Sequence, residues 1–242
     1  MNTDISKFWK ELDAFADSLI GQCEKSVDYS AESKIPLLYF LKERGTICSI
    51  MILLERHFVQ DARILLRSQA ENMIYLAAST KDKEGFRETF AAEFTKQQMK
   101  SSRDAAKSRE LLGQETEQHH LDREKELEES YKEIKDNTLS LKKMAEDSGL
   151  QLQHHHYYTS NYHEVHSLPF AVVKYFNMKE KSFIHLPDVE DIPLIACTAF
   201  KCYIRSMWFL IDFFKLESFR EDLAQLDEGK CKALTQKLLR AT

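Results

Sequence analysis

Apolar residues recur at helical spacing along much of the chain. Phe8, Leu12 and Leu19 lie on one stripe, which predicts a helix over about 4–25. After a polar break, a second and more apolar helix is expected over 35–54. Both segments are long enough to cross a small domain, because a helix rises about 1.5 Å per residue.

Residues that favour helix ends place two further helices. A third helix is expected to begin near Asp61, whose side chain can cap it, and to end near Ser79. Pro36 and Pro193 each stand where a first helical turn tolerates proline. The segment that Pro193 opens is strongly apolar through Phe214, and a shorter apolar helix is expected after Pro169, over about 170–178.

The stretch 82–148 differs from the rest in its charge. Residues 81–148 hold 14 basic and 17 acidic side chains, and their apolar positions are sparse but regularly spaced. Gly113, followed by two polar residues, is a natural reversal point. The pattern predicts two long antiparallel helices in a solvated hairpin that projects from the body, with a single continuous helix as the alternative.

Composition supports an all-α fold. The chain has 242 residues, of which 43% are hydrophobic and 30% charged, but only six are glycine and four proline. Average usage would give about 17 and 12. Sandwiches, barrels and doubly wound α/β folds need more turn residues than this. We therefore expect one helical bundle over 1–242, with the hairpin inserted at 82–148.

Charge and cysteine usage exclude some functions. The net charge of −5 argues against a general nucleic-acid coat, although a local basic site is compatible with it. The five cysteines form no C-x-x-C pair, and their apolar neighbours suit reduced, buried thiols. Without an apolar N-terminal region or an uninterrupted apolar span, a soluble cytoplasmic protein with no membrane segment, metal or cofactor is expected.

The first candidate site is a ladder of charged side chains in the third helix. Arg63, Arg67 and Glu71 are spaced i, i+4, i+8 and so lie along one helix face. One interpretation is an intrahelical Arg67–Glu71 ion pair at the edge of the core. In the functional interpretation, Arg67 anchors an anion, and Glu71 orients that anion or a histidine.

The second candidate site is a polar aromatic segment that contains Tyr158, Ser160, Asn161, His163 and His166. On a helix the two histidines share a face, and either can transfer protons near neutral pH. A histidine bonded to a core carbonyl, an anion site and a metal site are the open alternatives. The segment is one residue short of the H-E-x-x-H zinc pattern.

In their order along the chain, these features resemble a family of uncharacterised all-helical bacterial proteins. The R-S-x-x-E motif at 67–71, the charged hairpin and the Tyr/Ser/His segment at 157–166 carry the resemblance, which spans about 35–214. It implies a helical fold and leaves the activity open.

A looser similarity is to HEPN domains, the helical "higher eukaryote and prokaryote nucleotide-binding" family that includes many ribonucleases. Active members carry Arg, four to six residues, then His, and no histidine of this chain has an arginine at that spacing. Asn161 and His166 keep the polar residue and the histidine of this motif, and Arg67 would supply its positive charge from another helix. The resemblance implies a metal-independent ribonuclease with His166, Arg67, Glu71 and Asn161 as catalytic residues, and Arg63, Ser160, Tyr158 and His163 in binding.

Three functions are therefore expected, in this order. The first is an HEPN-like cytoplasmic protein, forming a homodimer, that binds or cleaves RNA or a nucleotide in phage defence or a stress response. The second is a non-enzymatic protein that docks a protein partner with the hairpin at 82–148. The third is a small-molecule or metal-binding bundle that uses His163, His166 and Glu71.

Overall fold

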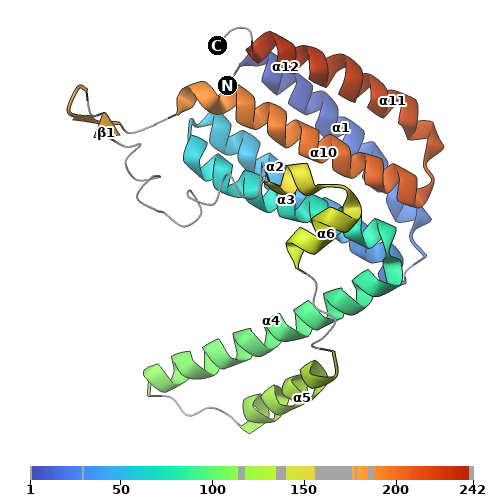
Figure 1. Ribbon diagram of the computed structural model, residues 1–242, viewed down its shortest axis with the longest axis vertical. Coiled ribbons are helices and arrows are strands. Elements are labelled where there is room, and N and C mark those ends of the chain that lie inside the picture. The colour runs from blue at the N-terminus through green and yellow to red at the C-terminus, as the bar shows by residue number, and fades with distance from the viewer. Residues whose placement is uncertain are drawn as a thin grey trace.

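The computed structural model describes residues 2–28, 30–113, 118–134, 140–155, 176–177, 179–184 and 188–239, and its helices dominate the fold (Figure 1). In chain order the elements are α1 (Thr3–Ser26), α2 (Ala31–Glu55), α3 (Val59–Lys81), α4 (Lys83–Leu111), α5 (Gln118–Ile134), α6 (Leu141–Ser148), α7 (Gln151–Gln153), β1 (Phe176–Asn177), β2 (Ser182–Phe183), the 3-10 turn η3 (Val189–Asp191), α10 (Ile192–Phe214), the 3-10 turn η4 (Glu217–Phe219), α11 (Arg220–Ala224), the π-helical segment η5 (Gln225–Cys231) and α12 (Lys232–Leu239).

Side-chain caps explain where the first helices begin. The Asn2 side chain accepts a hydrogen bond from the Asp4 amide, and Ser30 accepts one from the Ser33 amide. The Ser30 cap starts α2 earlier than expected, so that Pro36 lies inside the helix rather than in its first turn. Proline alone is therefore an unreliable marker of this helix start.

A left-handed residue separates α2 from α3. His57 has φ +64°, and the chain turns there without the glycine that usually signals such a bend. Phe58, and not Asp61, occupies the N-cap of α3, and it makes no side-chain cap bond. The expectation that Asp61 caps this helix is therefore wrong, because after the turn at His57 α3 already begins at Val59.

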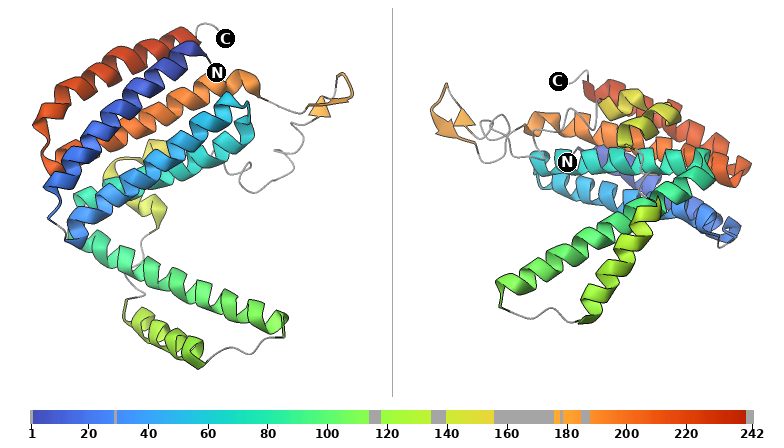
Figure 2. Two further views of the ribbon diagram at one scale, coloured as in Figure 1. Left: turned by 180° about the vertical axis from the view of Figure 1, so that it is seen from behind. Right: turned by 60° about the horizontal axis from the view of Figure 1, so that its bottom comes forward.

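Helices α2, α3 and α10 pack against one another at the centre of the body, and α1 and α12 cover α10 (Figures 1 and 2). Tyr203 of α10 is fully buried and stacks on Phe40 of α2 with ring centroids 5.1 Å apart. Arg44 ties α2 to α1 through Asp13 and Asp17. Burial of large side chains, each contributing about 1.5–3 kcal/mol, stabilises this centre.

A second apolar cluster fixes α6 to the body. Met144 and Ala145 of α6 are buried against Met73, Ile74 and Ala77 of α3. Gly149, with φ +72°, ends α6 in a left-handed cap. The charged stretch at 82–148 therefore comprises two helices that leave the body, α4 and α5, and a third, α6, that packs on it.

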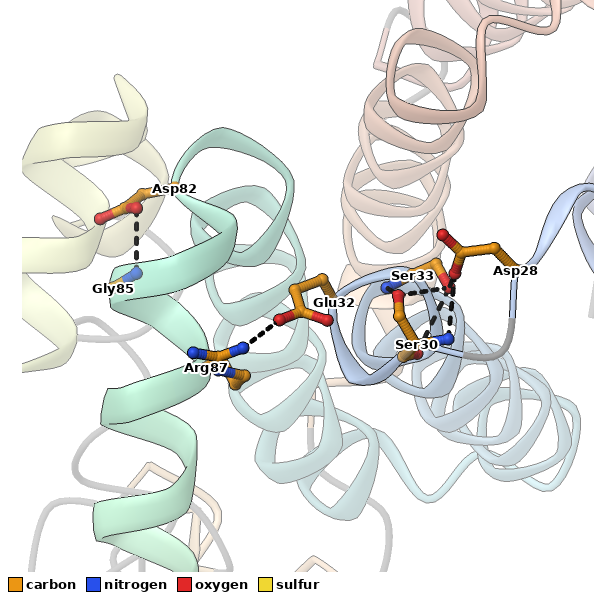
Figure 3. A network of polar contacts seen from close by, with 7 residues as sticks. All are labelled: Asp28, Ser30, Glu32, Ser33, Asp82, Gly85 and Arg87. Atoms are coloured by element: carbon orange, nitrogen blue, oxygen red, sulfur yellow. Dashed lines mark hydrogen bonds and ion pairs between the residues drawn. The ribbon is translucent and has the colours of Figure 1, made fainter.

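Helices α4 and α5 form the projecting hairpin (Figure 2). Gly113 has φ +67° just after α4, where the chain reverses. Arg103 of α4 pairs with Glu128 of α5 across the hairpin. At its base, Arg87 of α4 pairs with Glu32 of α2, which anchors the hairpin to the body (Figure 3).

The structure confirms the all-α class. The described strands are two residues each and pair antiparallel, with Phe176 opposite Phe183. A helix was expected over 170–178; residues 170–175 lie outside the described residues, and 176–177 are strand. No sequence pattern indicated this small hairpin.

Candidate functional site

Helix α3 presents the charged ladder at the edge of the core. Arg67 Nε lies 3.6 Å from Glu71 Oε1, one turn along the helix. The Arg67 side chain is 12% exposed and that of Glu71 is 35% exposed, while Ala70 and Met73 on the other face are fully buried. The structure thus forms the intrahelical ion pair and leaves its carboxylate open to solvent.

Arg63 holds α3 to the start of α10. Its guanidinium pairs with Asp191 and lies 3.8 Å from Asp188, and Gln60 also bonds Asp188. Two carboxylates therefore neutralise Arg63, and these ion pairs tether α3 to a segment far away in the sequence. The predicted role of Arg63 in ligand binding stays a prediction.

The histidine segment lies outside the described residues. Tyr158, Ser160, Asn161, His163 and His166 all fall within 156–175. Their proposed roles beside Arg67 and Glu71 therefore remain predictions. Of the neighbouring histidines, His154 is half-buried, and its burial lowers its pKa.

Sequence reasoning missed a buried polar cluster among α2, α3 and α10. Glu43 is fully buried, and its Oε1 lies 3.4 Å from the Nε2 of buried Gln69, which also donates to the Ala199 carbonyl at 2.9 Å. Burial raises the pKa of Glu43 to about 8, although contacts with Ser206 and Gln69 offset part of the rise. Glu43 is thus mainly protonated at neutral pH.

The signal for this cluster was present in the sequence. Glu43 and Arg44 interrupt the apolar run at 35–54, and an acidic residue at such a position needs either solvent or a partner. Arg44 is on the α1 side of the helix and pairs there, whereas Glu43 points into the core. The local sequence does not distinguish these two adjacent charged residues, and only the packing of the helices decides which of them is buried.

The hairpin carries opposite charges on its two helices. On α4, four exposed basic residues are spaced i, i+4, i+7, i+11, a set we call the basic stripe: Lys96, Lys100, Arg103 and Lys107. On α5, exposed acidic residues repeat the first part of this spacing and form the acidic stripe: Asp122, Glu126 and Glu129. By helical geometry the acidic stripe lies opposite the face of α5 that half-buried Leu127 and Tyr131 turn toward α4.

An aromatic pocket of about 230 Å³ lies where α4 leaves the body. Tyr39 and Tyr75 stack there with ring centroids 5.2 Å apart, and Phe86 and Phe90 meet Tyr39 edge-on. Lys42 adds a positive charge to the lining. The edge-on contacts of Phe86 and Phe90 with Tyr39 join the base of α4 to the body.

The described part of the chain also bears on metal and membrane sites. Within the described ranges, no three His, Cys, Asp or Glu side chains lie close enough together to hold a metal ion. One described helical stretch, Val189–Phe214, is long and apolar enough to cross a membrane by length and composition, but 67% of its apolar window is buried inside the bundle. Its composition is that of the central helix of a bundle.

Comparison with known proteins bears on the fold and the family. A model of a family of unknown function, DUF5677, matches residues 34–183, which include α2 from its fourth residue through α7 and the small strand pair. The match confirms the resemblance to an uncharacterised helical family. No curated protein and no solved structure matches the chain. Because the matched segment takes in more than half of its length, the chain belongs to the DUF5677 family.

Proposed function

We propose that this protein docks a protein partner through the α4 side of its projecting hairpin. The observation that carries the proposal is the basic stripe. Between Thr95 and Arg109, α4 holds five basic residues and one acidic residue, although the whole chain has a net charge of −5. A local concentration of exposed positive charge on a projecting element steers association with an acidic surface.

The tip of the hairpin supplies apolar anchors beside this charge. Leu111 and Leu112, at the end of α4, are 79% and 72% exposed. Adjacent exposed leucines beside a charged stripe form a small apolar patch that a partner can cover. Apolar anchors contribute most of the affinity of an interface, whereas charged neighbours set its specificity.

The acidic charge of the neighbouring helix α5 favours a protein over RNA. Packed helices lie about 8–10 Å apart, which is close to one Debye length at physiological salt. A nucleic acid drawn to Lys100 and Lys107 would therefore meet the repulsion of acidic α5, whose Glu128 reaches Arg103 across the hairpin. A protein surface can match both signs, with acidic groups toward α4.

Charge reversal tests this proposal. The triple variant Lys96→Glu, Lys100→Glu, Lys107→Glu is compared with wild type and with a matched control in which exposed lysines of the body are reversed, Lys10→Glu, Lys201→Glu, Lys232→Glu. Tagged full-length chains capture partners from lysate of the source cells, with and without ribonuclease treatment.

We expect wild type and the control to capture the same protein at equal yield after ribonuclease treatment. We expect the yield of this protein to fall at least tenfold with the stripe variant. With the double variant Leu111→Ser, Leu112→Ser the yield should fall by a comparable factor. Equal capture by the stripe variant, capture that ribonuclease abolishes, or no specific capture by wild type contradicts the proposal.

A second candidate is the HEPN-like activity on RNA or a nucleotide, in the cytoplasm and in phage defence or a stress response. It is favoured by the Arg67–Glu71 pair, a largely buried guanidinium beside a partly exposed carboxylate inside the segment that the family shares. His166 would remove the proton from a ribose 2′-hydroxyl or protonate the leaving oxygen. Arg67 would stabilise the charge that develops on the phosphorane, and Asn161 or Ser160 would bond a phosphate oxygen.

An RNA-cleavage assay tests this candidate. Wild type is expected to cleave, His166→Ala and Arg67→Met to lose activity by at least a hundredfold, and His155→Ala, at an exposed histidine nearby, to retain it. Equal activity of wild type and His166→Ala, or no activity in either, removes the ribonuclease. Nucleotide binding without cleavage would appear as a rise in melting temperature that Arg67→Met abolishes.

A further inference from the structure

The aromatic pocket between α2, α3, α4 and α6 has the composition of a ligand-binding site. Five aromatic residues line it: Tyr39, Tyr75, Phe86, Phe90 and Phe94. Pockets for small molecules are concave, mainly apolar or aromatic, and carry a few polar groups that orient the ligand. Every residue of this lining lies within 34–183, the segment that the DUF5677 family shares.

Contacts between the rings hold the lining in place. Tyr39 and Tyr75 stack, and Phe86 meets both of them nearly edge-on, with ring centroids 6.0 and 6.4 Å away. Phe94, which is 53% exposed, lies nearly parallel to Phe90, with 8° between the two ring planes. Rings that are already ordered can pack on a flat aromatic ligand without a further loss of side-chain entropy.

The polar part of the lining offers a ligand a positive charge. Glu93 pairs with Lys96 at 3.1 Å, and the Thr89 hydroxyl donates to the Gly85 carbonyl at 2.9 Å, so both groups are already occupied. Lys42 also lines the pocket, and it forms no ion pair with any described residue. The pocket therefore presents an ammonium group beside its rings.

Lys42 and Tyr39 can act together on one anion. They are three residues apart on α2, so their side chains lie on the same helix face. A second cavity of about 230 Å³ shares Tyr39, Lys42 and Phe90 with the aromatic pocket, which places Lys42 at the boundary between the two. The Tyr39 hydroxyl makes no hydrogen bond with a described residue, and burial and the neighbouring Tyr75 raise the pKa of Tyr39, so this group is a neutral donor.

The charge and the volume of the pocket select the kind of ligand. Aromatic cages often bind quaternary ammonium groups, but Lys42 would repel such a cation. Phosphate groups favour the bidentate guanidinium of arginine, and no described arginine lines the pocket, whereas one ammonium balances one carboxylate. The volume of about 230 Å³ lies below the roughly 300–1,000 Å³ typical of pockets for drug-sized molecules, which favours a small ring system.

From these contacts we infer that the aromatic pocket binds a planar aromatic carboxylate of one or two rings. The ligand ring packs against the rings of the lining, and its carboxylate accepts hydrogen bonds from Lys42 and Tyr39. The inference does not depend on the docking proposal, because Lys42 belongs to α2 and is not part of the basic stripe.

Isothermal titration calorimetry of the full-length protein with indole-3-acetate tests the site. Wild type is expected to bind one equivalent with a dissociation constant below about 1 mM. Indole lacks the carboxylate, tryptamine carries the opposite charge and acetate lacks the ring. Each of these three should bind about tenfold more weakly or less, because each loses either the charged hydrogen bonds or the ring contact.

Two exposed side chains allow the site to be changed without disturbing the core. Lys42→Met should weaken indole-3-acetate about tenfold and leave the affinity for indole unchanged, whereas Phe94→Ala should weaken both ligands. Lys100→Met, at an exposed lysine further along α4, is the matched control and should bind as wild type does, and melting curves of all variants should stay native. Absence of saturable binding in wild type, equal affinity for indole-3-acetate and tryptamine, or full affinity in natively folded Lys42→Met overturns the inference.

Discussion

The side-chain amide of Gln69 lies 3.4 Å from the carboxyl group of Glu43 in the middle of the bundle. The same amide donates to Ala199, so Gln69 links α2 to α10 from its place on α3. An acidic side chain at this position is costly when ionised, and burial raises the pKa of Glu43 to about 8 from an ordinary 4.5.

The stability of the protein should therefore fall with rising pH near neutrality. Between pH 4.5 and about 8 the folded protein holds a proton on Glu43 that the unfolded chain has lost. The stabilisation that this proton on Glu43 gives the folded state is full below pH 4.5. It declines by about 1.4 kcal/mol per pH unit above that and is lost above about pH 8. Chemical denaturation of wild type and Glu43→Gln across this range measures it, and the variant should show no such slope. An equal slope in Glu43→Gln would contradict the assignment; Glu24→Gln, at an exposed carboxylate, is the control.

Removing the hydroxyl of Tyr203 should stabilise the protein. Tyr203 is fully buried, and its hydroxyl oxygen has no hydrogen-bond partner among the described residues. Tyr203→Phe keeps the stacking on Phe40 and removes an unsatisfied polar group, so we expect the free energy of unfolding to rise by about 1 kcal/mol. Tyr203→Leu loses the ring contact and should lower it. A loss of stability in Tyr203→Phe would show that the hydroxyl is bonded in solution.

The five thiols should differ in reactivity. Cys23, Cys197, Cys202 and Cys231 are buried, and Cys48 is half-buried on α2. Burial raises the pKa of Cys48 less than it raises that of Cys202. A thiol reagent should modify Cys48 first in the native protein, and the other four only after unfolding. Rapid modification of wild type that persists in Cys48→Ala would contradict this order.

The Arg63 tether should control the start of α10. Arg63→Met loses both Asp188 and Asp191, so we expect unfolding free energy to fall by roughly 1 kcal/mol and amide exchange near Ile192 to accelerate. Asp191→Asn should have a similar effect, and the double variant should add little to either single change. Additive effects would show that the ion pair carries no coupling energy. Arg56→Met, at an exposed arginine, is the control.

The helices of the body were predictable because their apolar stripes are long and regular. The expected spans 4–25 and 35–54 each lie inside the observed α1 and α2. Helix ends were less predictable, since a non-glycine residue, His57, adopts the left-handed turn, and Ser30 caps α2 ahead of Pro36.

Long-range packing decided what local pattern could not. The apolar positions of α6 are too few to show that Met144 returns to the body instead of extending the hairpin. Likewise Glu43 and Arg44 are neighbours in sequence, yet one is enclosed by three helices and the other reaches α1. The Arg67–Glu71 pair was predictable because i, i+4 contacts are local, whereas the partners of Arg63 lie more than a hundred residues away.

The most direct measurement of the docking proposal is photo-cross-linking in the source cells. A benzophenone side chain replaces Asp104, which is exposed between Lys100 and Lys107, or Leu152 as a control on α7. We expect a ribonuclease-resistant protein adduct from position 104 that disappears when the charges of Lys96, Lys100 and Lys107 are reversed, and no adduct from position 152. A nucleic-acid adduct at position 104, or equal adducts at both positions, would contradict it.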